Sequence, residues 1–112
     1  MELVPAESID ATEAVENVHL KRLLDGEKMT VQHFSIEPGA TVPEHSHPHE
    51  QVGYMLSGEL TFVADGEDHL VEAGDSYVLA GDEPHAAENR GDVPAVGIDV
   101  FSPPREAPDW QD

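Results

Sequence analysis

The sequence predicts an all-β fold, built as a sandwich or barrel of short strands. Nine glycines and nine prolines punctuate the 112 residues at short intervals. Between them lie short runs rich in β-branched and aromatic residues, which favour strands. Many short strands with turn residues between them are typical of a sandwich or barrel. A chain of this length has room for one hydrophobic core, so residues 1–112 are predicted to form a single domain.

Eight runs of β-forming residues define the expected strands. Before them, Glu7–Glu16 has weak amphipathic character and is expected to hold at most a helical turn. The tail from Pro103 to Asp112 has three prolines and cannot join a sheet as a central strand. The predicted strands are Val18–Leu24, Met29–Glu37, Gln51–Leu56, Glu59–Ala64, His69–Val71, Ser76–Leu79, His85–Glu88 and Ala95–Phe101.

Composition excludes several classes of protein. There is no cysteine, so disulfides and thiolate metal sites are excluded and any metal must be held by nitrogen and oxygen. Apolar runs are only a few residues long, far too short for a membrane span. The segment Met1–Asp10 carries three acidic residues and lacks the basic start and apolar centre of a signal peptide. A cytoplasmic location is therefore expected.

The charge is strongly negative, with 24 Asp and Glu against five Lys and Arg and a net charge of −19. Such a surface repels nucleic acid and anionic lipid, so neither is expected as a partner. Two interpretations remain. The chain binds cations or basic partners, or it has the solvated surface of a salt-adapted, halophilic protein. We favour the second, because the acids are dispersed along the chain instead of forming a tail.

Four of the seven histidines lie close together or at suggestive spacings: His45, His47, His49 and His85. In an extended segment the side chains of His45 and His47 project to the same face. Gln51 follows four residues after His47, and His85 opens a later strand. Such nitrogen and oxygen donors suit a divalent transition metal. From spacing alone, a solvated histidine-rich turn explains the pattern equally well.

The segment GATVPEHSHPHEQVGYMLSG resembles the first motif of the cupin superfamily. Five residues separate Gly39 from His45, one separates His45 from His47, three separate His47 from Gln51, and six separate Gln51 from Gly58. Gln51 stands where the family usually has glutamate. This spacing is specific enough to favour a metal site over a chance cluster.

The later segment GDSYVLAGDEPHAAEN resembles the second cupin motif. Gly74 opens it, His85 falls at the position of the metal-binding histidine, and Asn89 closes it. The family's proline and second glycine are here Ala80 and Asp82, so this loop departs from the pattern. The resemblance implies a double-stranded β-helix, or jelly-roll, barrel with its metal-binding core at about residues 39–101 and a proline-rich tail at 102–112.

The resemblance also implies that one divalent metal is held by His45, His47, Gln51 and His85. Glu50 is expected to point outward, because neighbouring residues of a strand face opposite sides. Three neutral imidazoles and a neutral amide leave the metal's charge uncompensated, which favours anionic substrate groups. Positions left open on the metal would accept water or substrate. The remaining histidines are expected to have ordinary roles: His49 beside the site, His33 and His69 in strand or turn, and His19 without an identified partner.

The last predicted strand and its tail hold a second group of candidate residues. Asp99 and Phe101 share a face with Gly97, and this face is expected to line the barrel interior. A carboxylate buried there needs a partner or a function. Arg105 is one of only three arginines. It either binds an anion or forms an ion pair with Asp99 that pins the tail.

The combination of HSHPH, Gln51 and DVFSPPRE resembles the small cupins of pectin and alginate catabolism, which convert 4,5-unsaturated monouronates to linear keto sugar acids. In that family the last strand and tail supply an Asp, a Phe and an Arg, which match Asp99, Phe101 and Arg105. The tail departs from the family after Glu106. The resemblance implies that Asp99 is the acid–base, Arg105 holds the substrate carboxylate and Phe101 packs on the sugar.

Other functions remain open for the same site. No redox change is needed for ring opening, so Zn, Ni, Mn or Fe could serve. A cupin dioxygenase would use the same ligands but consume oxygen, and a non-catalytic sugar- or ligand-binding cupin would leave its ligand unchanged. A homodimer is expected, because cupins of this size usually pair through the outer sheet and an exposed sheet edge needs covering.

Overall fold

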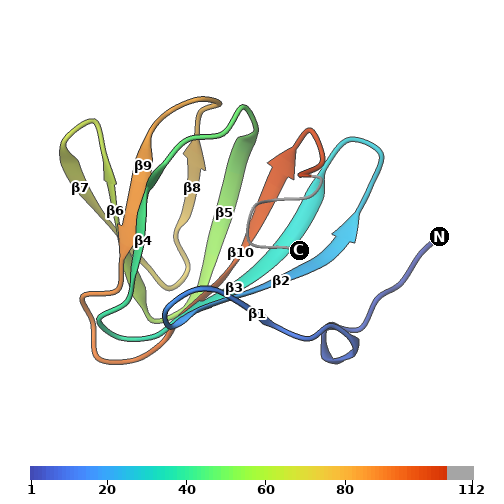
Figure 1. Cartoon of the computed structure of the whole chain (residues 1–112), viewed down its shortest axis with the longest axis horizontal. Coiled ribbons are helices and arrows are strands. Elements are labelled where there is room, and N and C mark those ends of the chain that lie inside the picture. Colours follow the sequence, from blue (N-terminus) through green and yellow to red (C-terminus); the bar gives the residue numbers. More distant parts are fainter. Residues whose placement is uncertain (106–112) are drawn as a thin grey trace.

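The computed structural model describes residues 1–105, which form two antiparallel β-sheets after a short N-terminal 3₁₀-helix, η1 (Ala6–Ser8) (Figure 1). One sheet has six strands in the order β1-β2-β3-β10-β5-β8, and the other has four in the order β4-β9-β6-β7. No helix within residues 1–105 is long and apolar enough to cross a membrane. The strands are β1 (Thr12–Val15), β2 (Val18–Asp25), β3 (Thr30–Ile36), β4 (Thr41–His45), β5 (Glu50–Ser57), β6 (Glu59–Ala64), β7 (Glu67–Glu72), β8 (Ser76–Leu79), β9 (His85–Glu88) and β10 (Ala95–Ser102).

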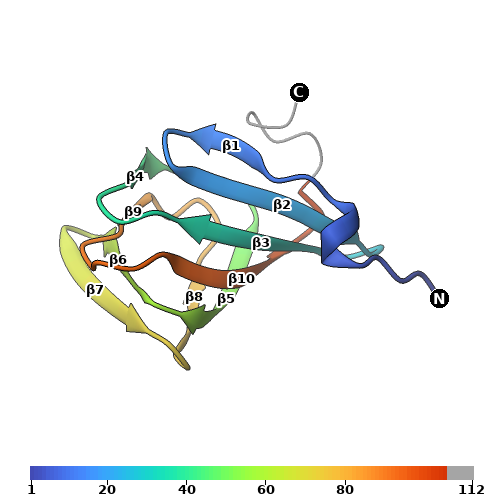
Figure 2. The same cartoon turned by 90° about the horizontal axis from the view of Figure 1, so that it is seen from below.

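The two sheets form separate layers that face each other, which confirms the predicted all-β fold (Figure 2). Residues alternate between buried and partly exposed along β3 and β10, so each strand turns one side to the interior. The core between the layers contains Phe34, Met55, Leu60, Phe62 and Ala95, among others. Both layers contribute to this core, and the polar residues described below lie on the same inward side of the strands.

All eight predicted strands are present, and three match residue for residue: Glu59–Ala64, Ser76–Leu79 and His85–Glu88. Two strands, β1 and β4, were not predicted. The expected helical turn is present as η1 at Ala6–Ser8, and β1 follows it because Thr12 pairs with Leu20 of β2. β4 contains Pro43 and forms an edge of its sheet, the position at which a strand tolerates proline.

An outer apolar face covers the outward side of β3, β10, β5 and β8. Residues opposite each other in an antiparallel pair point to the same side of the sheet. Two neighbouring cross-strand rows make up this face: Val31, Val100, Val52 and Val78, and His33, Ile98, Tyr54 and Ser76. Val52, Tyr54 and Val78 are 46%, 47% and 62% exposed.

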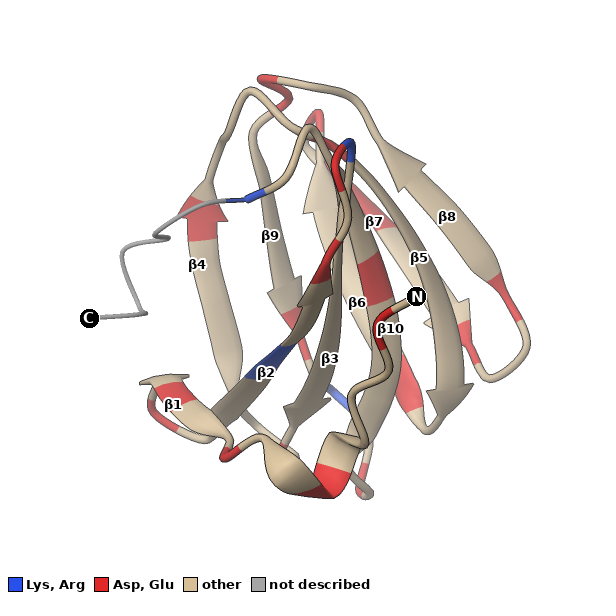
Figure 3. Ribbon diagram, turned by 90° about the vertical axis from the view of Figure 1, so that its right-hand side faces the viewer, with Lys and Arg blue, Asp and Glu red and all other residues tan. Residues whose placement is uncertain are grey.

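None of the residues of this outer apolar face is acidic, although the chain has 24 Asp and Glu. Acidic residues are spread over strands and loops elsewhere (Figure 3). A contiguous exposed apolar surface on a strongly acidic domain is typical of a protein–protein contact.

Candidate metal centre

Three histidines converge at one end of the space between the sheets. His45 ends β4 and lies directly opposite His85, the first residue of β9. His47 follows in the next loop, and its backbone oxygen accepts a 2.7 Å hydrogen bond from the amide of Asp82. One ring nitrogen from each of the three histidines lies within 4.8 Å of the others. The strand ends at His45 and His47 lies in the loop that follows, and the two rings point to the same place, as expected.

Backbone carbonyls set the proton position on each ring. The Nδ1 atoms of His45, His47 and His85 lie 2.9, 3.0 and 2.9 Å from the carbonyl oxygens of Pro43, His49 and Glu83. A carbonyl oxygen can only accept, so each Nδ1 donates its proton and each Nε2 keeps a free lone pair. This arrangement of imidazoles is the usual one at metal sites, where the far nitrogen is anchored to the protein.

Gln51 adds an oxygen donor to this group. It is buried on the inner face of β5, whereas Glu50 beside it is exposed and points outward, as expected. The Gln51 Oε1 atom lies 3.1 Å from His47 Nε2. With Nδ1 protonated, both facing atoms carry lone pairs and repel each other unless a positive charge lies beside them. The donor set therefore fits a divalent transition metal, with three imidazole nitrogens and one amide oxygen.

Burial favours the neutral form of two of the candidate ligand imidazoles. Desolvation lowers the pKa of His47 below its usual value, and the charges of Arg105 and His85 lower it further. Desolvation also lowers the pKa of His85. Only the neutral imidazole can bind a metal, so at neutral pH these ligands need lose no proton.

Asp99 lies next to this group, buried on the inner face of β10 at 6% exposure. Its Oδ1 atom accepts a 2.5 Å hydrogen bond from the hydroxyl of Tyr77 on β8. Burial raises the pKa of Asp99 to about 6, although hydrogen bonds from Tyr77 and Gln51 and the charge of Arg105 act in the opposite direction. A carboxyl group with such a pKa exchanges protons readily near neutral pH.

Tyr77 is a site residue that the sequence reasoning missed. Alternation within Ser76–Leu79 would have placed its side chain inward together with Leu79. Its contact with Asp99 depends on β8 and β10 both flanking β5, which no local pattern indicates. Burial and the neighbouring Asp99 raise the pKa of Tyr77, so its hydroxyl stays protonated and donates the hydrogen bond.

Phe101 and Arg105 complete this side of the site. Phe101 is buried on the inner face of β10, and its ring centroid lies 5.6 Å from that of His47. The guanidinium carbon of Arg105 lies 5.0 Å from the centre of the Phe101 ring, a cation–π distance. Phe101 therefore contacts both His47, a candidate metal ligand, and Arg105.

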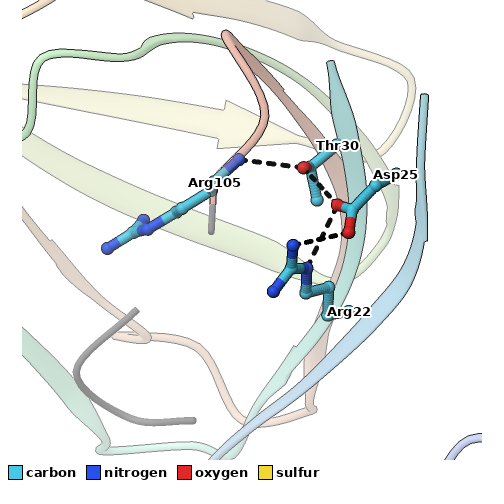
Figure 4. A network of polar contacts seen from close by, with 4 residues as sticks. All are labelled: Arg22, Asp25, Thr30 and Arg105. Atoms are coloured by element: carbon cyan, nitrogen blue, oxygen red, sulfur yellow. Dashed lines mark hydrogen bonds and ion pairs between the residues drawn. The ribbon is translucent and has the colours of Figure 1, made fainter. Parts of the chain in front are cut away.

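A chain of hydrogen bonds anchors the backbone at Arg105 (Figure 4). Its amide donates a 2.9 Å hydrogen bond to the hydroxyl of Thr30, which in turn donates to Asp25. Asp25 also accepts hydrogen bonds from the guanidinium of Arg22. The start of the tail is thus pinned to β2 and β3 through Thr30, a contact between residues far apart in sequence. The segment in which the sequence of the tail differs from the family pattern, Ala107–Trp110, lies outside the described residues.

The other histidines lie outside the group of three. The ring of His49 packs 5.6 Å from that of His47, and its buried Nδ1 has no hydrogen-bond partner within residues 1–105. His33 lies on β3 and His69 on β7. No partner could be identified for His19 from the sequence; in the structure its Nε2 lies 3.1 Å from Oε2 of Glu37.

A cavity of about 440 Å³ connects the candidate metal ligands with Asp99 and Arg105. Its polar lining includes His45, Gln51, Tyr77, His85, Asp99 and Arg105. Its apolar lining includes Leu20, Phe34, Val42, Leu60, Phe62 and Phe101. A concave site of this size with a few converging polar groups is suited to a small molecule.

Comparison with known proteins identifies similar chains. A family model described as Cupin domain matches residues 32–101. The pectin degradation protein KdgF of Dickeya dadantii is 33% identical over 78 residues, which cover 69% of this chain and 68% of that protein. The tetracenomycin polyketide synthase protein TcmJ of Streptomyces glaucescens is 33% identical over 72 residues, 63% of this chain. The chain spans only 48% of the length of that second relative.

Among solved structures, KdgF from a Halomonas species superposes with a TM-score of 0.86 at 22% identity, covering 95% of this chain and 96% of that one. At this identity the likeness shows the fold. It confirms the double-stranded β-helix barrel that the two sequence motifs implied.

Proposed function

The chain belongs to the cupin family, and we propose that it is a single-domain, metal-dependent enzyme that converts 4,5-unsaturated monouronates to linear keto sugar acids. The observation that carries the proposal is one cavity lined by a buried carboxyl group, Asp99, by Arg105, and by three of the four candidate metal ligands, His45, Gln51 and His85. The similarity to a pectin degradation protein supports the same class of substrate.

We propose that His45, His47, Gln51 and His85 hold the metal. A divalent ion bound there, Zn, Ni, Mn or Fe, supplies positive charge that binds substrate oxygens and stabilises developing negative charge. All four ligand groups are neutral, because each is an imidazole or an amide. The site therefore keeps the full charge of the ion, which favours a substrate that carries a carboxylate.

The reaction needs one proton removed from oxygen and one added to carbon. When the hemiacetal ring opens, the anomeric hydroxyl loses its proton, the ring C–O bond breaks and the anomeric carbon becomes an aldehyde. The released enolate then takes a proton on the neighbouring alkene carbon and becomes a ketone, so atoms and charge balance. Asp99 accepts the first proton and delivers the second. Its pKa of about 6 makes both protonation states accessible at neutral pH.

Arg105 and Phe101 orient the substrate. A guanidinium can make two parallel hydrogen bonds to a carboxylate, which fixes both the position and the plane of the uronate group. The backbone of Arg105 is held by Thr30, so the side chain starts from an anchored position in the structure. Phe101 provides an aromatic surface on the inner face of β10 against which the sugar packs.

The test is turnover of an unsaturated monouronate by metal-loaded protein, followed through loss of the enol absorbance. Asp99→Asn keeps the shape of the side chain but cannot transfer the proton, so turnover should fall by on the order of a hundredfold or more. Asp92→Asn, at an exposed loop position, is the matched control and should behave as the wild type. Asp99→Asn protein that unfolds more easily yet turns over normally per folded molecule would show that Asp99 is only structural.

A second candidate substrate class is favoured by the apolar share of the cavity lining, to which Leu20, Phe34 and Leu60 contribute. An aromatic, oxygen-rich molecule would place its rings against these residues and its oxygens at the metal. One relative is named a polyketide synthase protein, which is consistent with such a ligand. Failure to convert any monouronate, combined with tight binding of a hydroxylated polycyclic aromatic, would favour this class. Oxygen uptake during turnover would instead indicate a dioxygenase, and a ligand recovered unchanged would indicate a binding protein.

A further inference from the structure

We propose that Tyr77 is a positioning residue that holds the Asp99 carboxylate in its working orientation, and that the absence of a side chain at Gly53 makes this contact possible. The inference rests on the proposed role of Asp99 as the acid–base. It adds two residues, Tyr77 and Gly53, that neither sequence motif assigns.

The three residues form one row across three neighbouring strands. Gly53 of β5 lies opposite Tyr77 of β8 on one side and opposite Asp99 of β10 on the other. Residues paired in this way point to the same side of the sheet, here the interior. Adjacent strands lie about 4.8 Å apart, so the backbones of Tyr77 and Asp99 are separated by roughly 10 Å. A tyrosine side chain is long enough to cross this gap if nothing projects from the strand between.

Gly53 leaves that path open. A Cβ atom at position 53 would lie 2.1 Å from Cζ of Tyr77, 2.2 Å from its hydroxyl oxygen and 2.5 Å from Cε2. These distances are far inside van der Waals contact, so the Tyr77 ring occupies the space that any side chain at residue 53 would fill. The Tyr77 ring also packs against the ring of Phe62, with 4.6 Å between the two centroids.

The hydrogen bond that results limits the freedom of the carboxylate. Tyr77 donates to Oδ1 of Asp99 at 2.5 Å, and Gln51, a proposed metal ligand, also hydrogen-bonds to Asp99. A proton-transfer group works only from a narrow range of positions relative to the substrate, so a carboxylate held by a rigid strand and a buried phenol is better placed than one that rotates freely.

Two substitutions remove the contact by different means. Tyr77→Phe deletes the hydroxyl and leaves the ring in place, whereas Gly53→Ala forces the ring aside and leaves the hydroxyl present. Each should lower kcat by about tenfold or more with KM little changed, because substrate binding depends on other groups. The double variant should lose no more than the stronger single variant, since both act through the same hydrogen bond.

Matched controls separate this effect from general damage. Tyr54→Phe removes the hydroxyl of an exposed tyrosine on the opposite side of β5. Gly26→Ala adds a Cβ whose nearest neighbour would be 3.6 Å away, an ordinary contact. Both controls should keep wild-type kcat. Metal content and melting temperature are measured for every variant, so that kcat refers to folded, metal-loaded protein.

The outcomes distinguish this inference from the proposed function. If the wild type turns over a monouronate and Tyr77→Phe does so at the same kcat, the positioning role is wrong while the proposed function stands. If Gly53→Ala keeps wild-type kcat although Tyr77→Phe loses it, the role assigned to Gly53 is wrong. If the wild type has no turnover, the proposed function fails and the positioning role fails with it. A slowly exchanging Tyr77 hydroxyl proton in the NMR spectrum, lost in Gly53→Ala and kept in Gly26→Ala, reports the contact without any substrate.

Discussion

Metal binding should raise the melting temperature of this protein markedly, and His85→Ala should abolish most of that rise. His85 is only 3% exposed, and it lies opposite His45 on the neighbouring strand. After His85→Ala, no exposed histidine can therefore take the place of the lost imidazole. A ligand that binds only the folded chain, at a free concentration a hundred times its Kd, stabilises it by about 2.7 kcal/mol. The entropy of unfolding is about 2.1 cal/mol/K per residue, so for 112 residues the expected rise is about 11 °C.

The assay is thermal unfolding followed by calorimetry, with and without saturating Zn²⁺, Ni²⁺, Mn²⁺ or Fe²⁺. Salt is held constant and high, because the net charge of −19 makes stability depend on ionic strength. His69→Ala, which removes an exposed histidine from β7, should keep the full rise. Elemental analysis should find one ion per wild-type chain and none after His85→Ala.

The rise in melting temperature caused by the metal should depend on pH, because protons compete with the metal for the histidine nitrogens. Burial lowers the pKa of His47 and of His85 below its ordinary value, so at neutral pH both rings are already in the neutral form that a metal requires. As pH falls through their lowered pKa values, protons compete with the metal and the rise in melting temperature should disappear. Two results would refute the reasoning: His85→Ala that keeps the full rise, or a wild type that no divalent transition metal stabilises at saturation.

Three further expectations concern the tail, the outer surface and a turn. Arg105→Ala should raise KM for a monouronate with little change in kcat, and Arg105→Lys should recover only part of the loss, because lysine cannot make a planar two-point contact; equal KM values would contradict carboxylate binding. Light scattering in high salt should give about twice the 12.2 kDa of one chain, whereas Tyr54→Glu in the outer apolar face should give a monomer; a monomeric wild type would refute the dimer. Gly58→Ala should lower the free energy of unfolding by about 2–4 kcal/mol in denaturant titrations, because residue 58 has a φ of +74° and its Cβ would lie 2.2 Å from the Pro94 oxygen. Gly39→Ala, at a φ of +83° with open space around it, should cost only the roughly 1–2 kcal/mol of backbone strain, and equal losses in the two variants would show that the Pro94 contact is unimportant.

Asp82 stands where the second cupin motif has a glycine, yet it keeps the backbone conformation that the glycine would provide. The family has glycine where this chain has Asp82, and the backbone there has a φ of +63°. Aspartate is among the few residues other than glycine that adopt this left-handed conformation readily. The loop therefore keeps the geometry that glycine would provide, and the Asp82 amide donates its hydrogen bond to the His47 carbonyl.

The sequence by itself determined the features that depend on short-range pattern. Alternation along Ala95–Phe101 predicted that Asp99 and Phe101 face inward, and both are buried in β10. Which histidines meet was implied by the resemblance of Gly39–Gly58 and Gly74–Asn89 to the two cupin motifs, and not by spacing alone. The inward direction of Asp99 and Phe101 could be inferred because the period of a strand is set by neighbouring residues.

Only the tertiary structure decided which strands lie beside one another. The contact between Tyr77 and Asp99 requires β8 and β10 to flank β5, and the anchor of Arg105 joins residues 75 positions apart. The strands β1 and β4 are short and partly polar, and they form because β2 and β9 offer paired backbone partners. Their stability, like the position of Tyr77, comes from contacts between distant segments, which exist only once the two sheets have packed.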